Sequence, residues 1–156
     1  EDYDNDGDVD LYIANDFGPN QLFRSEGEYF VDESSESGSQ DWGFGMSATW
    51  ADYDRDGFMD LYVSSMFSGA GNQVVAQSDF NANMPEETRT RYLKMVRGNT
   101  LLKNSGQGQF EDLTSPMAEG FGGWAWGAKF ADFNNDGWED LYVANGYISQ
   151  PDTDDL

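Results

Sequence analysis

The sequence predicts an all-β fold made of repeated four-stranded antiparallel units, and three observations support this prediction. An acidic loop of the form D-x-(D/N)-x-D-G-x-x-D-L-Y occurs three times, each time directly before aromatic and β-branched residues. Matching hairpin sequences follow the first two loops, and aromatic segments precede the second and third. Because Asp, Asn and Gly favour turns while aromatic and β-branched residues favour strands, each unit reads strand, loop, strand, strand, turn, strand.

The acidic loops, which begin at residues 2, 52 and 132, have the ligand pattern of a calcium site. Oxygen ligands at alternate positions, with a glycine at the turn, suit a hard cation such as Ca²⁺. An EF-hand loop opens in the same way but needs a bidentate Glu at its twelfth position and flanking helices. Here the twelfth residues are Ile13, Val63 and Val143, which cannot bind a metal. We therefore expect β-hairpin loops that hold about three Ca²⁺ ions.

Each loop is expected to supply side-chain oxygens from its first, third, fifth and ninth positions and a backbone carbonyl from its seventh. The predicted ligands are Asp2, Asp4, Asp6, Asp8, Asp10, Asp52, Asp54, Asp56, Phe58, Asp60, Asp132, Asn134, Asp136, Trp138 and Asp140. Asn134 offers a neutral oxygen, so the third site should be weaker. The alternative is a set of Asp-Asn-Gly turns that bind nothing, which the matched spacing of three copies disfavours.

The charge of the chain restricts its partners and its location. Thirty acidic residues against eight basic ones give a formal net charge of -22. Without a cation the loops would repel one another, so calcium should also support folding. Such acidity argues against nucleic acid and anionic membranes as partners, and no apolar run is long enough for membrane insertion. Because weak modular calcium sites suit calcium-rich compartments, we expect an extracellular, cell-surface or periplasmic location.

The repeats divide the chain into three expected parts. Residues 1–34 should be the latter part of a blade that starts in its calcium loop, 35–114 a complete blade, and 115–156 the first half of the next. The unit length fits a propeller, so the predicted fold is an all-β, calcium-binding β-propeller segment of four-stranded antiparallel blades with a short helical insertion. Since propellers generally need four or more blades, we expect a piece of a longer polypeptide.

The second unit contains an insertion at about residues 66–98. Residues 66–83 are expected to be a loop, and residues 85–97 a helix with proline and acids at its start. Half of the basic residues of the chain lie on this helix: Arg89, Arg91, Lys94 and Arg97. The favoured interpretation is that the helix packs Tyr92 and Val96 on the propeller rim while its cations balance an acidic body, and the alternative is a partner-binding lobe.

Strand connectivity assigns the loops to two opposite faces. Successive turns of a four-stranded meander alternate between its ends, so every acidic loop should lie on one face and the insertion on the other. The insertion should share its face with the links at residues 15–20, 34–41, 115–123 and 146–156. Loops on a rigid scaffold usually carry the binding function. We therefore expect a protein or cell-surface partner at the insertion face, with the calcium face as structural support.

Aromatic residues near the expected first strands are assigned to the core. They are Trp42, Phe44, Trp50, Trp124 and Trp126. The alternative is a carbohydrate-stacking platform, which an exposed Trp pair on the insertion face would favour. An enzyme is not expected, because the chain lacks His and Cys and most of its paired carboxylates are assigned to calcium. A calcium-dependent lyase or hydrolase propeller is the remaining catalytic alternative.

Three stretches carry a resemblance to a known family: DYDNDGDVDLYIAN, ADYDRDGFMDLYV and GWAWGAKFADFNNDGWEDLYVANGYI. They resemble the FG-GAP/VCBS repeats of integrin-α-type β-propellers. The Trp-Ala-Trp-Gly stretch, residues 99–102 and residues 144–147 more narrowly resemble the bacterial secreted ASPIC/UnbV group, which is related to cartilage acidic protein. The resemblance implies a secreted propeller of about seven blades, calcium at the hairpin loops, and adhesion or surface assembly rather than catalysis. Asn134 and the insertion depart from the family pattern.

Overall fold

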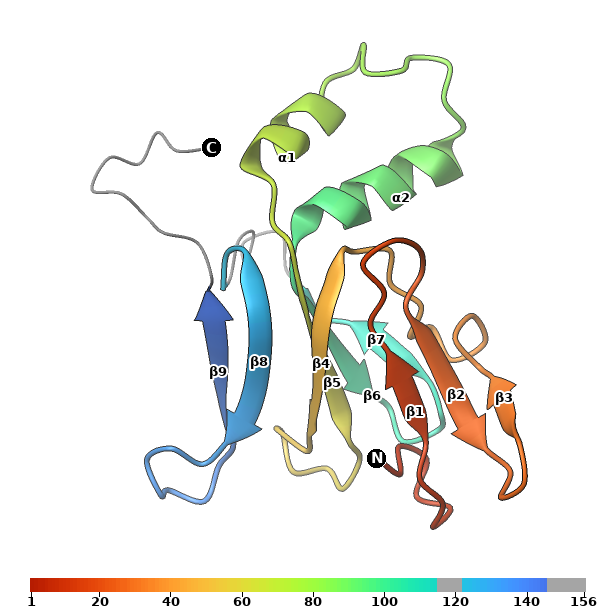
Figure 1. Ribbon diagram of the computed structural model, residues 1–156, viewed down its shortest axis with the longest axis vertical. Helices are drawn as coiled ribbons and strands as arrows, with labels where there is room; N and C mark the ends of the chain where they lie inside the picture. Colours follow the sequence, from red (N-terminus) through yellow and green to blue (C-terminus); the bar gives the residue numbers. More distant parts are fainter. Residues whose placement is uncertain (115–121, 146–156) are drawn as a thin grey trace.

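The computed structural model describes residues 1–114 and 122–145, which form mainly antiparallel β-structure with two short helices (Figure 1). The strands are β1 (Leu11–Ile13), β2 (Gln21–Ser25), β3 (Phe30–Asp32), β4 (Gly45–Ala51), β5 (Asp60–Ser65), β6 (Thr100–Asn104), β7 (Phe110–Asp112), β8 (Ala125–Ala131) and β9 (Asp140–Asn145). The helices are α1 (Gly69–Val75) and α2 (Glu86–Arg97). Most of the expected links at 115–123 and 146–156, and part of the 144–147 motif, lie outside the described residues.

The strands form three sheets whose order follows the chain. The first sheet is β1-β2-β3, the second is β4-β5-β6-β7 and the third is β8-β9, and all pairs are antiparallel. The pairing of β4 with β5 shifts register between Gly45 and Ser47, and the pairing of β8 with β9 shifts between Ala125 and Gly127. The same irregularity thus recurs at equivalent positions, and the strand that was expected from Trp42 begins only at Gly45.

Two hydrophobic clusters join the sheets face to face. The first cluster packs Tyr12 and Leu22 of the first sheet against Leu61, Val63 and other residues of the second. The second cluster packs Tyr62 of the second sheet against Phe130, Leu141 and Val143 of the third. Neighbouring residues on β5 therefore point to opposite sides, as the two-residue period of a strand requires. The second sheet is covered on both faces, which explains why every residue of β5 is buried.

The outer faces of the first and third sheets expose apolar residues at positions that are buried in the second sheet. Leu11 is 45% exposed, whereas its equivalent Leu61 is fully buried. Tyr142 is 60% exposed, whereas its equivalent Tyr62 is 2% exposed. The sequence positions are the same, and the difference comes from the presence of a neighbouring sheet on each side.

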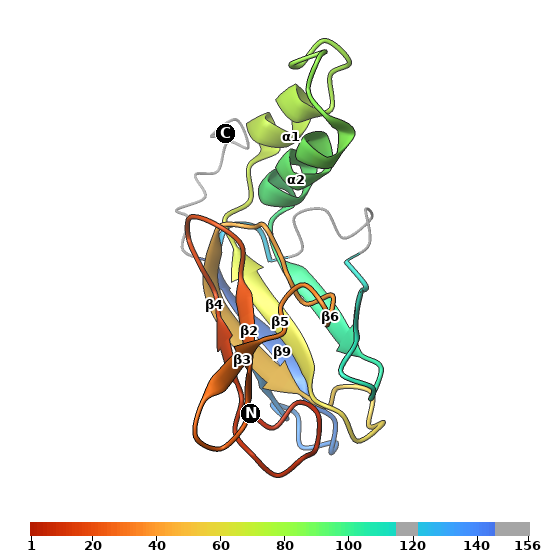
Figure 2. The same ribbon diagram turned by 90° about the vertical axis from the view of Figure 1, so that its right-hand side faces the viewer.

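The two helices stand at one end of the sheets, and the acidic loops lie at the other end (Figures 1 and 2). This arrangement confirms the two-face expectation for the described residues. The expectation of a loop over residues 66–83 is wrong in part, because α1 forms there. The Ser68 side chain accepts a hydrogen bond from the Gly71 amide, and the Asn72 side chain donates to the Val96 carbonyl of α2. A cap and a contact with α2 thus support a helix too short to be stable alone.

The predicted helix at residues 85–97 is confirmed as α2, but its packing differs from the expectation. Tyr92 packs on Phe80 within the insertion, with ring centroids 5.9 Å apart, rather than on the rim of the sheets. Arg97 ties the helix to the second sheet through an ion pair of 2.9 Å with Asp112. Neither helix in the described parts of the chain is long and apolar enough to cross a membrane.

Candidate functional site

The three acidic loops share one backbone conformation. Their fourth residues are all left-handed, with φ of 61° at Asn5, 62° at Arg55 and 58° at Asn135. Their sixth residues are glycines with positive φ, including 95° at Gly7 and 91° at Gly57. A side chain at the glycine position would be strained, which explains the recurring glycine. The repeat in sequence is therefore also a repeat in local shape.

The first, third and fifth side chains of each loop turn inward and accept hydrogen bonds from loop amides. In the first loop, Asp2 accepts from the amides of Asp6 at 3.1 Å and Gly7 at 3.0 Å. The corresponding bond to the sixth-position glycine is 3.0 Å long from Gly57 to Asp52 and 2.8 Å long from Gly137 to Asp132. The third-position and fifth-position acceptors are Asp4, Asp54, Asn134, Asp6, Asp56 and Asp136. These bonds fix the orientation of the side-chain oxygens in each loop.

The aspartate at the ninth position connects its loop to the sheet. Asp10 accepts hydrogen bonds from the amides of Tyr3 at 3.1 Å and Ser25 at 2.8 Å. Asp60 accepts from the amide of Asn104, the residue of β6 that corresponds to Ser25 in β2, at 2.8 Å. In the third loop, the amide of Phe133 donates to Asp140 at 3.2 Å. The ninth aspartate therefore stabilises the attachment of the loop to the strands, in addition to its predicted role as a ligand.

Two carboxylates of the second loop are sparsely hydrogen-bonded: within the described residues the buried Asp52 Oδ1 has no partner, and Asp60 accepts only from the backbone amides of Asn104 and Tyr53. Asp60 is fully buried, and its burial, together with the charges of Asp54 and Asp56, raises the pKa of its carboxyl to about 6. A buried carboxylate oxygen without a partner is costly. The loop thus offers a place where a positive charge would be stabilising.

Carboxylate oxygens gather closely in two of the three loops. Oxygens of Asp2, Asp4 and Asp10 lie within 4.8 Å of one another, and so do oxygens of Asp52, Asp54 and Asp56. The acids of the third loop, Asp132, Asp136 and Asp140, do not gather as closely. Asp6 is outside the first group and Asp60 outside the second, although both were predicted as ligands. All oxygens in these groups are hard donors of the kind that calcium prefers.

The second loop attracts a cation from its own chain, which sequence reasoning missed. The Lys103 ammonium pairs with Asp54 and lies 3.3 Å from Asp56. The hydrogen bond to Asp54 raises the pKa of Lys103 well above its usual value. Arg24, the equivalent of Lys103 in the first sheet, instead pairs with Glu26 at 2.6 Å. Both basic residues occupy the fifth position of the matched segments 20–25 and 99–104. This shared position was the sequence signal that could have indicated a cation near the first and second acidic loops.

The residues at the seventh position make contacts that their predicted role as carbonyl ligands did not anticipate. Phe58 packs so closely on Gly106 of the β6–β7 turn that a Cβ there would lie 2.3 Å from its ring. Trp138 is covered by the Arg55 guanidinium, 4.0 Å from the ring centroid. Asp8, the seventh residue of the first loop, is exposed and donates its amide to Asp6. Two of these side chains therefore link a loop to its neighbours.

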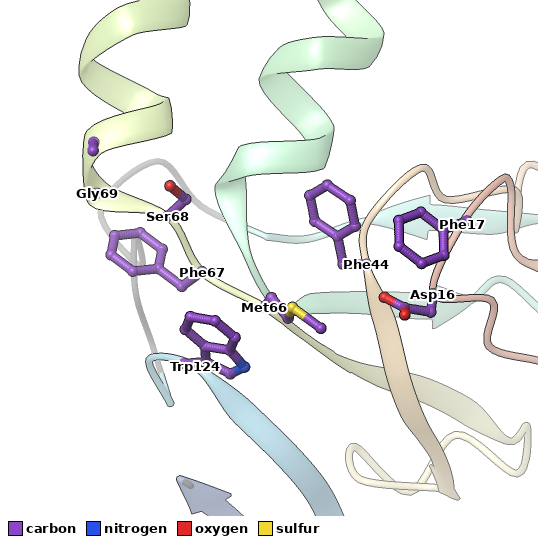
Figure 3. A pocket seen from close by; sticks show the side chains of 9 residues that line it. Asp16, Phe17, Phe44, Met66, Phe67, Ser68, Gly69 and Trp124 are labelled. Atoms are coloured by element: carbon purple, nitrogen blue, oxygen red, sulfur yellow. The ribbon is translucent and has the colours of Figure 1, made fainter. Parts of the chain in front are cut away.

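The insertion end carries a pocket of about 260 Å³ instead of a repeated loop (Figure 3). Its wall includes Phe44 and Trp124, two members of the predicted aromatic core. Trp50 does pack in the first cluster, as predicted. Trp126 does not, because it is 52% exposed and stacks on Trp124 with ring centroids 6.5 Å apart. Trp124 is half-buried, so the stack at residues 124–126 meets only in part the condition of an exposed Trp pair that would favour carbohydrate.

Comparison with known proteins agrees with the repeat seen in sequence and structure. The family model for an FG-GAP-like repeat matches residues 2–63 and 92–143, which include all three acidic loops. The interval between the matches, residues 64–91, contains α1 and the start of α2, so the insertion is largely outside the family pattern. A search among curated proteins found no match. The matched residues make up well over half of the chain, which therefore belongs to the FG-GAP-like repeat family.

Proposed function

We propose that this chain is a calcium-stabilised β-propeller segment of a secreted or cell-surface protein that mediates protein–protein interaction, adhesion or surface assembly. FG-GAP repeats are typical of interaction and adhesion domains, and the family is generally non-enzymatic. The proposal includes the narrower relationship to the ASPIC/UnbV and cartilage acidic protein-related group. Its support is the Trp-Ala-Trp-Gly stretch at residues 124–127 and the segment at residues 99–102.

The observation that carries the calcium proposal is the close gathering of carboxylate oxygens in the first and second loops, together with the buried Asp52 Oδ1, which has no hydrogen-bond partner in the described part of the chain. The residues fit the ion, because every loop offers several oxygen donors and the loop amides already orient them. Bound calcium would supply positive charge to satisfy these oxygens and offset the repulsion between the aspartates. The chain itself supplies orientation, since Asp10 and Asp60 fix their loops to β2 and β6.

The exposed outer faces support the propeller part of the proposal. Leu11 and Ile13 are 45% and 42% exposed on the first sheet, and Tyr142 is 60% exposed on the third. Their equivalents in the second sheet are covered by a neighbouring sheet on each side. We therefore assign residues 1–34 to the latter part of one blade, 35–114 to a complete blade and 115–156 to the first half of another. Further blades would cover the two outer faces.

The proposed location is extracellular, cell-surface or periplasmic. Calcium is abundant there, and weak modular sites would be filled. The net charge of -22 supports a cationic or polar partner over nucleic acid, and membrane insertion is not part of the proposal. The insertion face is the proposed binding face. The segments that connect the strands at this face differ from one another, whereas the acidic loops at the opposite face repeat one structure, and variable loops on a rigid scaffold usually carry binding.

Isothermal titration with Ca²⁺ tests the proposal. We expect about three binding events in the natural chain, and the loss of one event in Asp52→Asn. Asp79→Asn is the matched control, because Asp79 is an exposed acid of the insertion, outside the loops. If the natural chain took up no Ca²⁺ from millimolar solution, the calcium proposal would be wrong.

Carbohydrate binding is a second candidate, favoured by the stacked pair of Trp124 and Trp126. The rings are nearly parallel, with an interplanar angle of 24°, and half of Trp126 is exposed. Aromatic faces of this kind can stack against sugar rings. Saccharide binding that is lost in Trp126→Ala, with unchanged Ca²⁺ uptake, would support this candidate. Saccharide binding that persists in the variant would contradict it.

A further inference from the structure

The pocket at the insertion end is built from segments that are far apart in the sequence. It lies among the link from β1 to β2, the segment before β4, the segment that leads into α1, and the residue before β8. In Figure 3, Phe67 and Trp124 lie on one side of the pocket, Phe17 and Phe44 lie on the other, and Met66 lies between them. Its volume of about 260 Å³ is below the range of pockets for drug-sized ligands, so it suits one small chemical group.

Four aromatic side chains line this pocket: Phe17, Phe44, Phe67 and Trp124. Phe17 is 86% exposed, and it meets the ring of Phe44 edge-on, with centroids 6.4 Å apart and an interplanar angle of 81°. Trp124 on the other side is braced by its stack on Trp126. A phenylalanine that remains this exposed loses the benefit of burial, and exposed apolar patches mark sites of interaction. The pocket is therefore a candidate site for a group that aromatic rings attract.

The charge of the pocket is negative. Asp16 lines it, and its carboxylate points toward Met66 in Figure 3. Within the described residues, Asp16 makes no side-chain hydrogen bond or ion pair, and no Lys or Arg lines the pocket. Two other aromatic rings of the chain are covered by its own cations, namely Trp138 by Arg55 and Trp42 by Arg91, at 4.0 and 4.3 Å. Within the described part of the chain, no such cation covers Phe17, Phe44 or Phe67.

We propose that this pocket binds an organic cation of the quaternary or methylated ammonium class. Aromatic faces attract such cations, the thioether of Met66 is polarisable, and Asp16 supplies a negative charge at the edge. An unmethylated ammonium is strongly hydrated and fits a mostly apolar wall less well. The proposal names a ligand chemistry for the insertion face, so it rests on the proposed function.

A titration with two probes of the same shape tests the charge requirement. The probes are choline and its neutral isostere 3,3-dimethylbutan-1-ol, and the readout is the indole N–H signals of the calcium-loaded chain in NMR spectra. The Trp124 signal is assigned with Trp124→Phe. We expect choline to bind about tenfold more tightly than the alcohol, a difference of ~1.4 kcal/mol. Equal binding of both probes, or no shift with choline, would overturn the proposal.

Variants of the pocket are compared with matched variants elsewhere on the surface. Asp16→Asn and Phe17→Ala should each weaken choline binding several-fold, and both residues are exposed enough to leave folding intact. Asp79→Asn and Phe30→Ala are the controls and should leave choline binding unchanged, because both residues lie outside the pocket. Equal weakening by a variant and its control would contradict the site.

The source of the cation is distinguished by a second pair of probes. A short peptide with trimethyllysine is compared with the same peptide with unmodified lysine, alongside choline. Tighter binding of the methylated peptide than of choline would indicate a protein partner, and equal binding would indicate a free or lipid-borne head group. Calcium titration of the same samples keeps the two proposals separate, since a chain that binds Ca²⁺ but not choline would refute only the pocket proposal.

Discussion

The strands are connected by different structures at the two ends of the sheets. At the loop end, three loops repeat one backbone shape, with left-handed residues at Asn5, Arg55 and Asn135. At the insertion end, α1 and α2 form a unique lobe beside an aromatic pocket. The comparison teaches that the repeated end carries the architecture, while the irregular end is free to differ and to carry specificity.

The two ends also differ in how their contacts are distributed along the chain. Most hydrogen bonds of an acidic loop join residues two to five positions apart, such as Asp2 to Gly7. The insertion depends on contacts across much longer intervals, such as Asn72 to Val96 and Arg97 to Asp112. Because Asp10 and Asp60 also join their loops to β2 and β6, changes at the loop end should alter global stability. Changes at the insertion end should act locally, because α1 is supported mainly by α2.

Removal of calcium is expected to have the largest effect. An excess of EDTA should lower the melting temperature strongly, because a site kept at a hundredfold excess over its dissociation constant contributes ~2.7 kcal/mol. Circular dichroism with and without EDTA measures the shift, and excess Ca²⁺ should restore the original value. An unchanged melting temperature in EDTA would contradict the assigned role of the loop end.

Asp60→Ala should have the next largest effect, a loss of about 3 kcal/mol in the free energy of unfolding. The substitution leaves the buried Asn104 amide without its acceptor and removes a predicted calcium ligand. Urea denaturation measures the loss, with Asp79→Ala as an exposed acid control. A loss as small as that of the control would show that the ninth position does not fix the loop to the sheet.

Arg97→Ala should have an intermediate and local effect of about 1 to 2 kcal/mol. Arg97 pairs with Asp112 at 2.9 Å and bonds the Thr100 hydroxyl at 3.0 Å, so its loss should release α2 from the second sheet. Hydrogen exchange should speed up in α1 and α2 while β5 stays protected. Exchange that increases equally in both regions would contradict the local character of the insertion end.

The same variant should change the pH dependence of stability. Burial raises the pKa of Asp41, and Arg97 opposes this rise. An acid whose pKa is raised in the folded state makes stability fall as pH increases above its unfolded value. Without Arg97 the Asp41 pKa should rise further, so Arg97→Ala should lose stability more steeply than the natural chain from about pH 4 upward. If the free energy of unfolding changed with pH in the same way in Arg97→Ala and in the natural chain, the assigned effect of Arg97 on Asp41 would be wrong.

Lys103→Gln should have the smallest effect, a rise of about two- to threefold in Ca²⁺ affinity at the second loop. Its ammonium pairs with Asp54 and Asp56, so it competes with a metal for the same oxygens. Arg24→Gln is the matched control and should leave the first loop unchanged, because Arg24 pairs with Glu26 and Glu33. Equal effects of the two variants on calcium titration would contradict the competition.

Much of the described fold could be predicted from the sequence, and the errors have a common cause. The antiparallel strands and α2 follow from local patterns, and so does the placement of loops and insertion at opposite ends. Helix α1 was missed because, apart from the local cap at Ser68, its support comes from Val96 of α2, and no local pattern reveals that contact. Tyr92 was assigned to the wrong neighbour for the same reason, since Phe80 lies within the insertion.

By itself, the sequence determined the acidic loops, because glycine sterics and the hydrogen bonds of aspartate side chains act within a few residues. Only the tertiary structure decided which equivalent residues are buried, as the contrast between Leu11 at 45% exposure and the fully buried Leu61 shows. It also decided that Lys103 turns to its loop while Arg24 turns away. Burial and ion pairing depend on neighbours brought together by packing, and a local pattern does not specify those neighbours.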